Sequence, residues 1–521
     1  MFKASPAVRN SLLLASLFTA STIAACSTDK IVYRDRQPFN QPVASAAGFL
    51  GYYDTVTKQT TCGNCHADFQ GNWSQTKHAK AWANLAASPG KAATCEGCHS
   101  VTGRGNAAQG QTAGHDGVKS AVYYDVQCES CHGAGLQHVE GVGQGTLIRP
   151  LAKISMTGAG NCGDCHSGAH QPFAEEWKQS EHASIPTGTH ATNATCTGCH
   201  EGRAALARIA GDNPNYQEKN TATDYQAITC GVCHDPHGSP NSAQLRKSIS
   251  SADPEQNLCM QCHNRRNVPD NSSASPHAPQ GSVLLGIAGY RPPGFEYDTA
   301  RIYGSHATDR NPRLCAGCHV NRFTVTDKLT GAFSFQATGH LMRPVPCLDA
   351  SGKPTADKTC AYTVAARSWQ SCASSTCHGS AAVAANVFNT VRSRMKFLSD
   401  QLWTNLNNDG TLQGTPTDGG LLATLKTTRP GEWSTPTSVT PAEGAEFNAR
   451  LCGEYNQSNA DNSKGVHNPF LCDALLVATI NYVRSYYGLP AASASVQAEI
   501  DRPLSGDLKK SMQISRSAPG S

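Results

Sequence analysis

The chain has 521 residues with 23 Cys and 20 His, and 16% of its residues are charged, against about 25% in a typical soluble domain. Hydrophobic residues make up 39% and aromatic residues 7%, so side chains alone would give a thin core at this length. Lys and Arg number 43 and Asp and Glu 39, without a basic run. This balance argues against a nucleic-acid partner.

The N-terminus has the order of a secretory signal peptide. The first residues include Lys3 and Arg9 and no acid, an apolar run follows from Leu12 to Phe18, and small residues continue up to Ala25. The apolar run is too short for a permanent membrane helix, and no other stretch reaches about 18 apolar residues. The segment Ile23-Ala24-Ala25-Cys26 resembles a bacterial lipoprotein signal, although ordinary cleavage beside a small residue is the alternative. We therefore expect residues 1–25 to be removed and Cys26 to carry lipid.

Eight Cys-x-x-Cys-His segments follow, the spacing of covalent c-type haem attachment. Two thiols reach the vinyl groups of one porphyrin edge, and the next residue supplies an axial imidazole. Zinc ribbons and disulfides also use paired Cys, but eight copies with an attached His favour haem. A ninth segment, Cys372-Ala-Ser-Ser-Thr-Cys377-His378, has four intervening residues and predicts a ninth haem. The predicted thioether residues are Cys62, Cys65, Cys95, Cys98, Cys128, Cys131, Cys162, Cys165, Cys196, Cys199, Cys230, Cys233, Cys259, Cys262, Cys315, Cys318, Cys372 and Cys377. The predicted proximal ligands are His66, His99, His132, His166, His200, His234, His263, His319 and His378.

Four other cysteines remain once the nine haem segments and Cys26 are set aside: Cys347, Cys360, Cys452 and Cys472. An even remainder suits two disulfides in an oxidising compartment. Local pairing, Cys347 with Cys360 and Cys452 with Cys472, is one of three possible connectivities.

The first six proximal histidines recur every 33 or 34 residues, which predicts stacked units that share haem cover. Eleven other histidines face nine irons, whereas Met is scarce, so ligation by two imidazoles is expected at most sites. Two segments, Trp73-Ser-Gln-Thr-Lys-His78 and Trp177-Lys-Gln-Ser-Glu-His182, repeat 104 residues apart. The expected distal ligands are His78, His138, His170, His182, His237, His277, His306, His340 and His467, with His115 and His190 as spares.

The expected fold is a haem-stacked cytochrome, mostly coil with short α-helices and little or no β-structure. Residues 26–50 read as a tether, 51–250 as a six-haem repeat region, 251–384 as a three-haem region and 385–521 as a haem-free helical region. Apolar residues from Val383 to Leu406 recur at steps of three and four, which predicts an amphipathic helix. A second helix is predicted from Pro469, with Asn468 as its N-cap, to Gly488. The stretch from Gly414 to Pro441 reads as a loop.

Over about residues 60–380 the chain resembles the outer-membrane and extracellular multihaem c-type cytochromes of metal-respiring bacteria. Segments such as Cys128–His138 and Cys230–Gly238 are similar to recurring segments of that group, and the surroundings of His467 resemble a C-terminal ligand segment of multihaem nitrite reductases. The resemblance implies conduction through haem c groups from the cell envelope to extracellular metal or quinone acceptors, with redox partner cytochromes and a possible porin conduit. An outer-membrane lipoprotein at the cell surface is expected, and the periplasmic face stays open.

Two alternatives remain. A multihaem oxidoreductase for a small nitrogen or sulfur compound usually carries a Cys-x-x-Cys-Lys segment, which this sequence lacks, although the irregular ninth site could be open. In a polymeric cytochrome filament, one subunit would donate a distal His to a haem of the next. This chain has enough His to provide both axial ligands of every haem itself. No catalytic residue is therefore expected.

Overall fold

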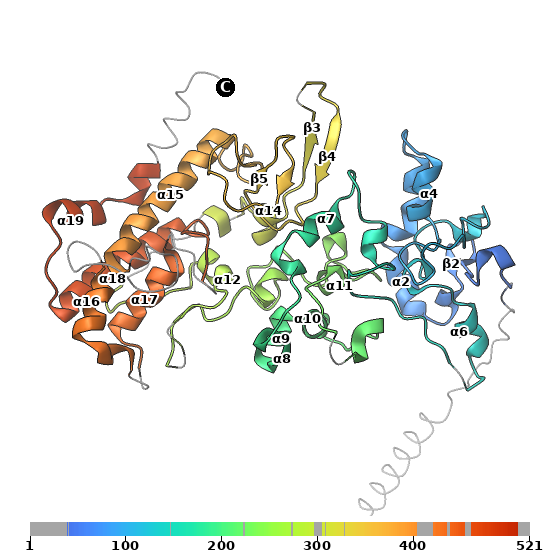
Figure 1. The fold of residues 1–521 in the computed structure, drawn as a ribbon, viewed down its shortest axis with the longest axis horizontal. Coiled ribbons are helices and arrows are strands. Elements are labelled where there is room, and N and C mark those ends of the chain that lie inside the picture. The colour runs from blue at the N-terminus through green and yellow to red at the C-terminus, as the bar shows by residue number, and fades with distance from the viewer. Residues whose placement is uncertain are drawn as a thin grey trace, which may run out of the picture. The chain divides into compact units, whose positions relative to one another are not determined.

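Short helices joined by coil make up most of the motif region, residues 51–384, which carries the nine Cys-His segments (Figure 1). The structure is a computed structural model that describes residues 39, 41–145, 147–221, 224–271, 273, 275–295, 305–307, 309–327, 329–403, 420–434, 438–453 and 460–508. Cys26 and the expected signal peptide lie outside these residues. The α-helices of the motif region are α2 (Ala67–Ser74), α3 (Ala81–Ala86), α4 (Ala93–His99), α5 (Glu129–His132), α6 (Leu136–Gly141), α7 (Phe173–Lys178), α8 (Thr189–Thr192), α9 (Ala194–His200), α10 (Gly202–Ala210), α11 (Cys230–Cys233), α12 (Gln280–Leu284) and α14 (Cys315–His319).

The strands form three separate antiparallel hairpins. These are β1 (Tyr52–Asp54) with β2 (Gln59–Thr60), β3 (Phe323–Thr326) with β4 (Phe333–Ala337), and β5 (Cys347–Leu348) with β6 (Pro354–Thr355). At the β3–β4 turn, the Asp327 carboxylate accepts hydrogen bonds from the backbone N–H groups of Leu329 and Thr330. The expected fold of coil, short helices and little β-structure is confirmed.

Buried glutamates join distant segments of the motif region. Apolar packing there is divided among small clusters, so no single apolar core holds these segments together. The Glu129 carboxylate accepts hydrogen bonds from the backbone N–H groups of Leu50, Gly51 and Gly135 at 2.7–3.0 Å. Glu218 accepts from Ser155 in the same way at 3.1 Å. A carboxylate that accepts several backbone hydrogen bonds fixes chain segments that have no regular structure of their own.

The C-terminal helices hold the one large apolar cluster among the described residues. They are α15 (Ala381–Leu402), α16 (Leu421–Thr428), α17 (Pro441–Cys452), α18 (Pro469–Tyr487) and α19 (Ala494–Ile500). Figure 1 shows α15, α17 and α18 packed side by side. The predicted α15 and α18 are confirmed: Asn468 caps α18 by accepting from Leu471 N–H, and Gly488 ends it in the left-handed region at φ 60°. The last residue of the first apolar pattern, Leu406, lies outside the described residues.

The prediction of a loop from Gly414 to Pro441 is wrong, because α16 lies within it. Leu421, Leu422 and Leu425 are buried in the helical cluster. A helix of eight residues is marginal alone and is stabilised by tertiary packing, so its short pattern gave no clear periodic signal. No helix in the described ranges is long and apolar enough to cross a bilayer.

Candidate haem-binding sites

A single helical turn shapes the Cys-x-x-Cys-His segments. In five of them the His backbone N–H donates to the carbonyl of the first Cys, as His66 does to Cys62 at 3.0 Å. This turn brings residues i, i+3 and i+4 to one side, where a porphyrin edge can meet both thiols. In the longer ninth segment, His378 N–H donates to Cys372 O at 3.1 Å and Cys377 N–H to Ser374 O. The two additional residues therefore form a turn between Ser374 and Cys377. The backbone of His378 stays hydrogen-bonded to Cys372, as in the shorter segments.

Eight of the nine proximal imidazoles lie opposite a second imidazole at a nearly constant spacing. A metal–nitrogen bond of about 2 Å on each side of an iron places the two ring centroids about 6 Å apart. The observed centroid distances are His66–His138 6.4 Å, His132–His237 6.1 Å, His166–His78 6.1 Å, His200–His277 6.2 Å, His234–His340 6.3 Å, His263–His182 6.1 Å, His319–His467 6.1 Å and His378–His306 6.3 Å. The spacing fits an iron with two axial imidazoles, and the paired thiols fit covalent haem.

Hydrogen bonds at Nδ1 orient the rings. Backbone carbonyls face Nδ1 of His132, His234 and His319 at 2.7–3.0 Å, and carbonyls also face His99, His138 and His306. A carbonyl only accepts, so Nδ1 carries the proton and Nε2 keeps its lone pair for a metal. Burial also lowers the pKa of His78 and His340 to about 4, which favours the neutral, ligating form.

The repeated Trp segments position two of the expected distal ligands by the same contacts. The Trp73 indole N–H donates to Val126 O at 2.9 Å, and Val126 N–H donates to His78 O at 3.1 Å. The second copy repeats both contacts: Trp177 donates to Ile228 O at 2.9 Å, and Ile228 N–H donates to His182 O at 3.0 Å. Val126 and Ile228 each lie two residues before a Cys-x-x-Cys-His segment. The repeat therefore fixes an expected distal ligand of one site against the attachment turn of another.

One expected distal ligand is not paired with a proximal imidazole. The His170 ring is exposed and stacks on Phe333 of β4 at 4.7 Å, a contact with no signal in the local sequence. His99, the second proximal residue, has no imidazole opposite it at the spacing of the other eight, although all 20 histidines are among the described residues. The irregular ninth site, by contrast, has His306 opposite His378.

The two histidines that were expected to be spares, His115 and His190, are not part of any of the eight imidazole pairs. His115 is buried edge-on against Trp82 at 4.9 Å. His190 stacks on His200 at 4.5 Å, too close to hold an iron between the rings, whereas His277 has the required spacing from His200.

Contacts between thiols of different segments show which attachment turns are neighbours. The thiol side chains of five pairs from different segments are direct neighbours: Cys62 and Cys128, Cys98 and Cys165, Cys162 and Cys230, Cys199 and Cys262, and Cys259 and Cys315. Cys131 with Cys162, Cys233 with Cys259 and Cys318 with Cys372 are close enough to interact electrostatically. The first, third, fourth, sixth, seventh, eighth and ninth segments thus form a continuous row. The second segment adjoins the fourth, and the fifth adjoins the seventh.

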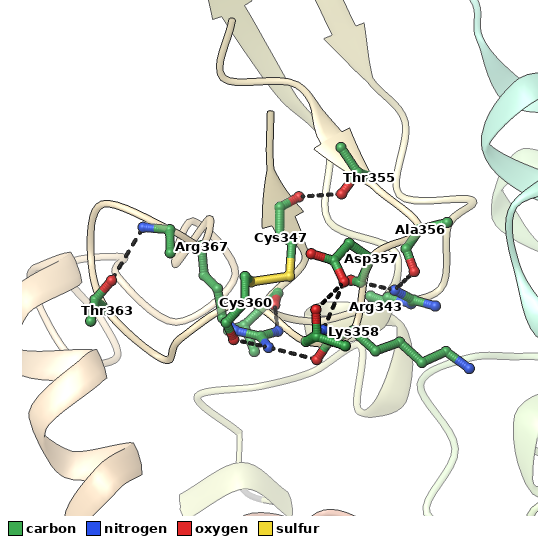
Figure 2. The surroundings of a disulfide bond; sticks show 12 residues. Arg343, Cys347, Thr355, Ala356, Asp357, Lys358, Cys360, Thr363 and Arg367 are labelled. Carbon is green, nitrogen blue, oxygen red and sulfur yellow. Dashed lines mark hydrogen bonds between the residues drawn. A yellow bond between two sulfur atoms is a disulfide. The ribbon is translucent and has the colours of Figure 1, made fainter. Parts of the chain in front are cut away.

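The structure contains the two disulfides of the local pairing, which was one of the three connectivities that the sequence left open. Figure 2 shows Cys347 of β5 bonded to Cys360, with Arg367 donating hydrogen bonds to the carbonyls of Cys360 and Lys358. An oxygen of Asp357 lies near the two sulfurs, but sulfurs joined in a disulfide are not thiolate ligands for a metal ion.

The second disulfide, Cys452 to Cys472, joins α17 to α18 within the apolar cluster.

Comparisons with known proteins support the binding of haem c by this chain. A family model described as "Cytochrome c554 and c-prime" matches residues 61–133, and one described as "Doubled CXXCH motif" matches residues 224–267. Over 234 residues, 39% of this chain and 30% of the relative, the chain is 28% identical to the C-type polyheme cytochrome OmcB of Geobacter sulfurreducens. Over 170 residues, 26% of this chain and 22% of the relative, it is 31% identical to the C-type polyheme cytochrome OmcC. The matches thus cover less than a third of either relative's length, and no solved structure matches.

Proposed function

The chain is a multihaem c-type cytochrome, and we propose that it transfers electrons through nine covalent haems, one at each Cys-His segment. The observation that carries this proposal is the set of eight imidazole pairs with centroids 6.1–6.4 Å apart. An iron with two axial imidazoles exchanges electrons but has no free position for a substrate. At these eight sites the chain therefore acts as a conductor.

The thiol contacts support a definite route. Electrons pass along the row of the first, third, fourth, sixth, seventh, eighth and ninth haems, and the second and fifth haems are side branches. Cys162 supports this order because it approaches both Cys131 and Cys230, the neighbours on either side in the row. The row runs from the N-terminal segments to the C-terminal helices.

The envelope location is proposed from the sequence. Cys26 follows a lipoprotein-like signal, and it is the one cysteine left after nine haems and two disulfides. We propose that lipid on Cys26 holds the protein at the outer membrane, where it passes electrons from redox partner cytochromes, or a porin conduit, to extracellular metal or quinone acceptors. The variant Cys26→Ala should lose membrane fractionation and keep its haems; unchanged fractionation would refute the anchor.

Acceptor range tests the conduction proposal. Reduced holoprotein is mixed with ferric chelate, ferric oxide and a quinone analogue, and reoxidation is followed at the haem absorbance bands. A conductor should reduce all three, at rates set by driving force and access. His182→Met, within the row, should raise the potential of one haem and slow all three reactions together, since Met is a weaker donor than a second imidazole. Rapid turnover of one small oxyanion alone would contradict conduction.

The unpaired His99 favours a second candidate, in which the second haem binds a small nitrogen or sulfur compound. Its Nδ1 faces Ala81 O at 2.8 Å, so Nε2 is oriented for iron as at the paired sites. A His from another copy in a filament would fill the same axial position. A monomer in detergent would exclude the filament, and cyanide binding at one haem per chain would support the ligand-binding alternative.

A further inference from the structure

The histidines that are proposed to bind the eighth and ninth irons converge on one short segment of the haem-free C-terminal region. His467 of this segment lies opposite His319, the proximal residue of the eighth site. Its neighbour Val466 accepts a hydrogen bond at its carbonyl from Nδ1 of His306, at 2.8 Å. Residues 460–467 therefore serve two sites, and the C-terminal helices hold this segment in place through α18, which begins at Pro469.

The orienting group of His467 differs from the carbonyls that orient other ligands. Its Nδ1 lies 2.6 Å from Oδ1 of Asp461, whose side chain is fully buried. The Ser463 hydroxyl donates to the other carboxylate oxygen, and the His467 backbone N–H donates to Ser463 Oγ at 3.2 Å. The carboxylate is therefore held in place on the imidazole by its own loop.

A buried carboxylate has an electronic effect that a carbonyl lacks. A carboxylate that accepts the Nδ1 proton raises the basicity of the imidazole as a metal ligand. A negative charge in a low-dielectric site also stabilises the more positive, oxidised iron. Both effects act in the same direction and lower the reduction potential.

Two other expected ligands also have a charged side chain at Nδ1, and they differ from His467. Asp235 approaches His237 Nδ1 at 3.3 Å, but Arg246 pairs with that carboxylate at 2.9 Å and offsets its charge. His277 Nδ1 lies 2.9 Å from the Arg266 guanidinium, a positive neighbour. Among the described ligand contacts, the Asp461 pair is the one with a fully buried carboxylate in a short hydrogen bond.

We propose that Asp461 is a positioning residue that, through His467, gives the eighth haem a lower potential than its neighbours in the row. This inference deepens the proposed function and rests on a haem being present at Cys315 and Cys318. In the row the eighth haem lies between the seventh and the ninth, because Cys315 contacts Cys259 and Cys318 approaches Cys372. A low-potential haem at this position is an uphill step that slows electron passage into the ninth haem.

The test is Asp461→Asn in the full holoprotein. The amide oxygen still accepts the Nδ1 proton while the charge is removed, so the ligand stays in place and only the potential changes. Redox titrations followed at the haem bands are compared, since the area between two curves gives the summed shift of all haems. We expect one haem to be reduced about tenfold more readily at a fixed potential, about 59 mV for one electron. Asp327→Asn, in the exposed β3–β4 turn, is the matched control and should superimpose on the parent.

Electron paramagnetic resonance of the oxidised proteins gives the second readout. Unchanged low-spin signals with a raised summed potential support tuning by the charge. An unchanged titration with nine haems by mass overturns the inference and leaves conduction intact. A new high-spin signal in Asp461→Asn also overturns it, because the carboxylate would then only hold the loop. If the parent protein itself has no haem at Cys315 and Cys318, that result would instead contradict the proposed function.

Discussion

Glu176 connects the repeat region to a proposed ligand more than 160 residues away. It lies on α7 and is 3% exposed. One carboxylate oxygen accepts Thr338 N–H at 2.8 Å, and the other accepts the Thr338 hydroxyl at 2.6 Å and His340 N–H at 2.7 Å. Since His340 lies opposite His234 at 6.3 Å, Glu176 holds the backbone of the proposed distal ligand of the sixth haem.

The substitution Glu176→Gln isolates these contacts because it preserves side-chain size. Whichever oxygen becomes the amide NH₂, at least one of the three donors then faces another donor. A buried donor without an acceptor costs about 1–3 kcal/mol, and the remaining bonds lose their charge assistance, about 1 kcal/mol each. We therefore expect a loss of roughly 3 kcal/mol in the stability of the unit that contains the sixth haem.

Denaturant unfolding, followed at the haem bands, measures this loss. Glu176→Gln should move the midpoint of the transition in which low-spin haem is lost to lower denaturant concentration. Glu175→Gln is the matched control, because Glu175 is the exposed neighbour on the same helix and accepts one bond, from Gly168 N–H at 2.8 Å. Its effect should be a few tenths of a kcal/mol. Equal midpoints for the two variants would refute the reasoning.

Three further predictions follow from the sites and the C-terminal helices. Intact mass should show nine covalent haems, and replacing both Cys372 and Cys377 by Ser should remove one; eight in the parent would exclude the ninth site. The oxidised protein should show one high-spin haem, that of His99, which binds one cyanide per chain; a fully low-spin spectrum would contradict this. Burial opposes ionisation of Glu446, but Arg450 and Lys426 outweigh it and lower the pKa below its usual value of 4.5. The helical region should therefore lose stability as pH falls from 4.5 through that lowered pKa, and Glu446→Gln should flatten the pH dependence; parallel melting curves would disprove it.

The sequence predicted what local chemistry determines. Attachment segments are recognisable because the thiols and the imidazole must lie within one turn, and α18 was predictable because Asn468 and Gly488 terminate it. Eight of the nine expected distal histidines, which lie opposite attachment-segment histidines in the structure, were predictable from the His count and the Trp73 repeat. Their pairing was not, because His78 meets His166 and His182 meets His263 through folding of the coil between them.

The features that the sequence did not predict depend on distant partners. A single Glu176 or Asp461 carries no pattern, and each acquires its role from segments that the fold brings to it. His170 illustrates the same limit: it was among the expected distal ligands, but the β3–β4 hairpin places Phe333 on its ring. Counting histidines thus predicted eight of the imidazoles that lie opposite an attachment-segment histidine. It could not show that His99 is the attachment-segment histidine with no second imidazole opposite it.

The distribution of apolar packing explains why the ligand pairs also organise the fold. Apart from the large cluster centred on the C-terminal helices, the buried apolar residues of the described ranges fall into small, separate clusters. The imidazole pairs instead join residues far apart in sequence, such as His319 with His467, and buried carboxylates such as Glu176 brace the coil around them. Closing such long loops costs conformational entropy, and metal–ligand bonds, like disulfides, offset that cost by cross-linking the chain. The groups that we propose to hold the conducting haems are therefore the same groups that hold the repeat region in one conformation.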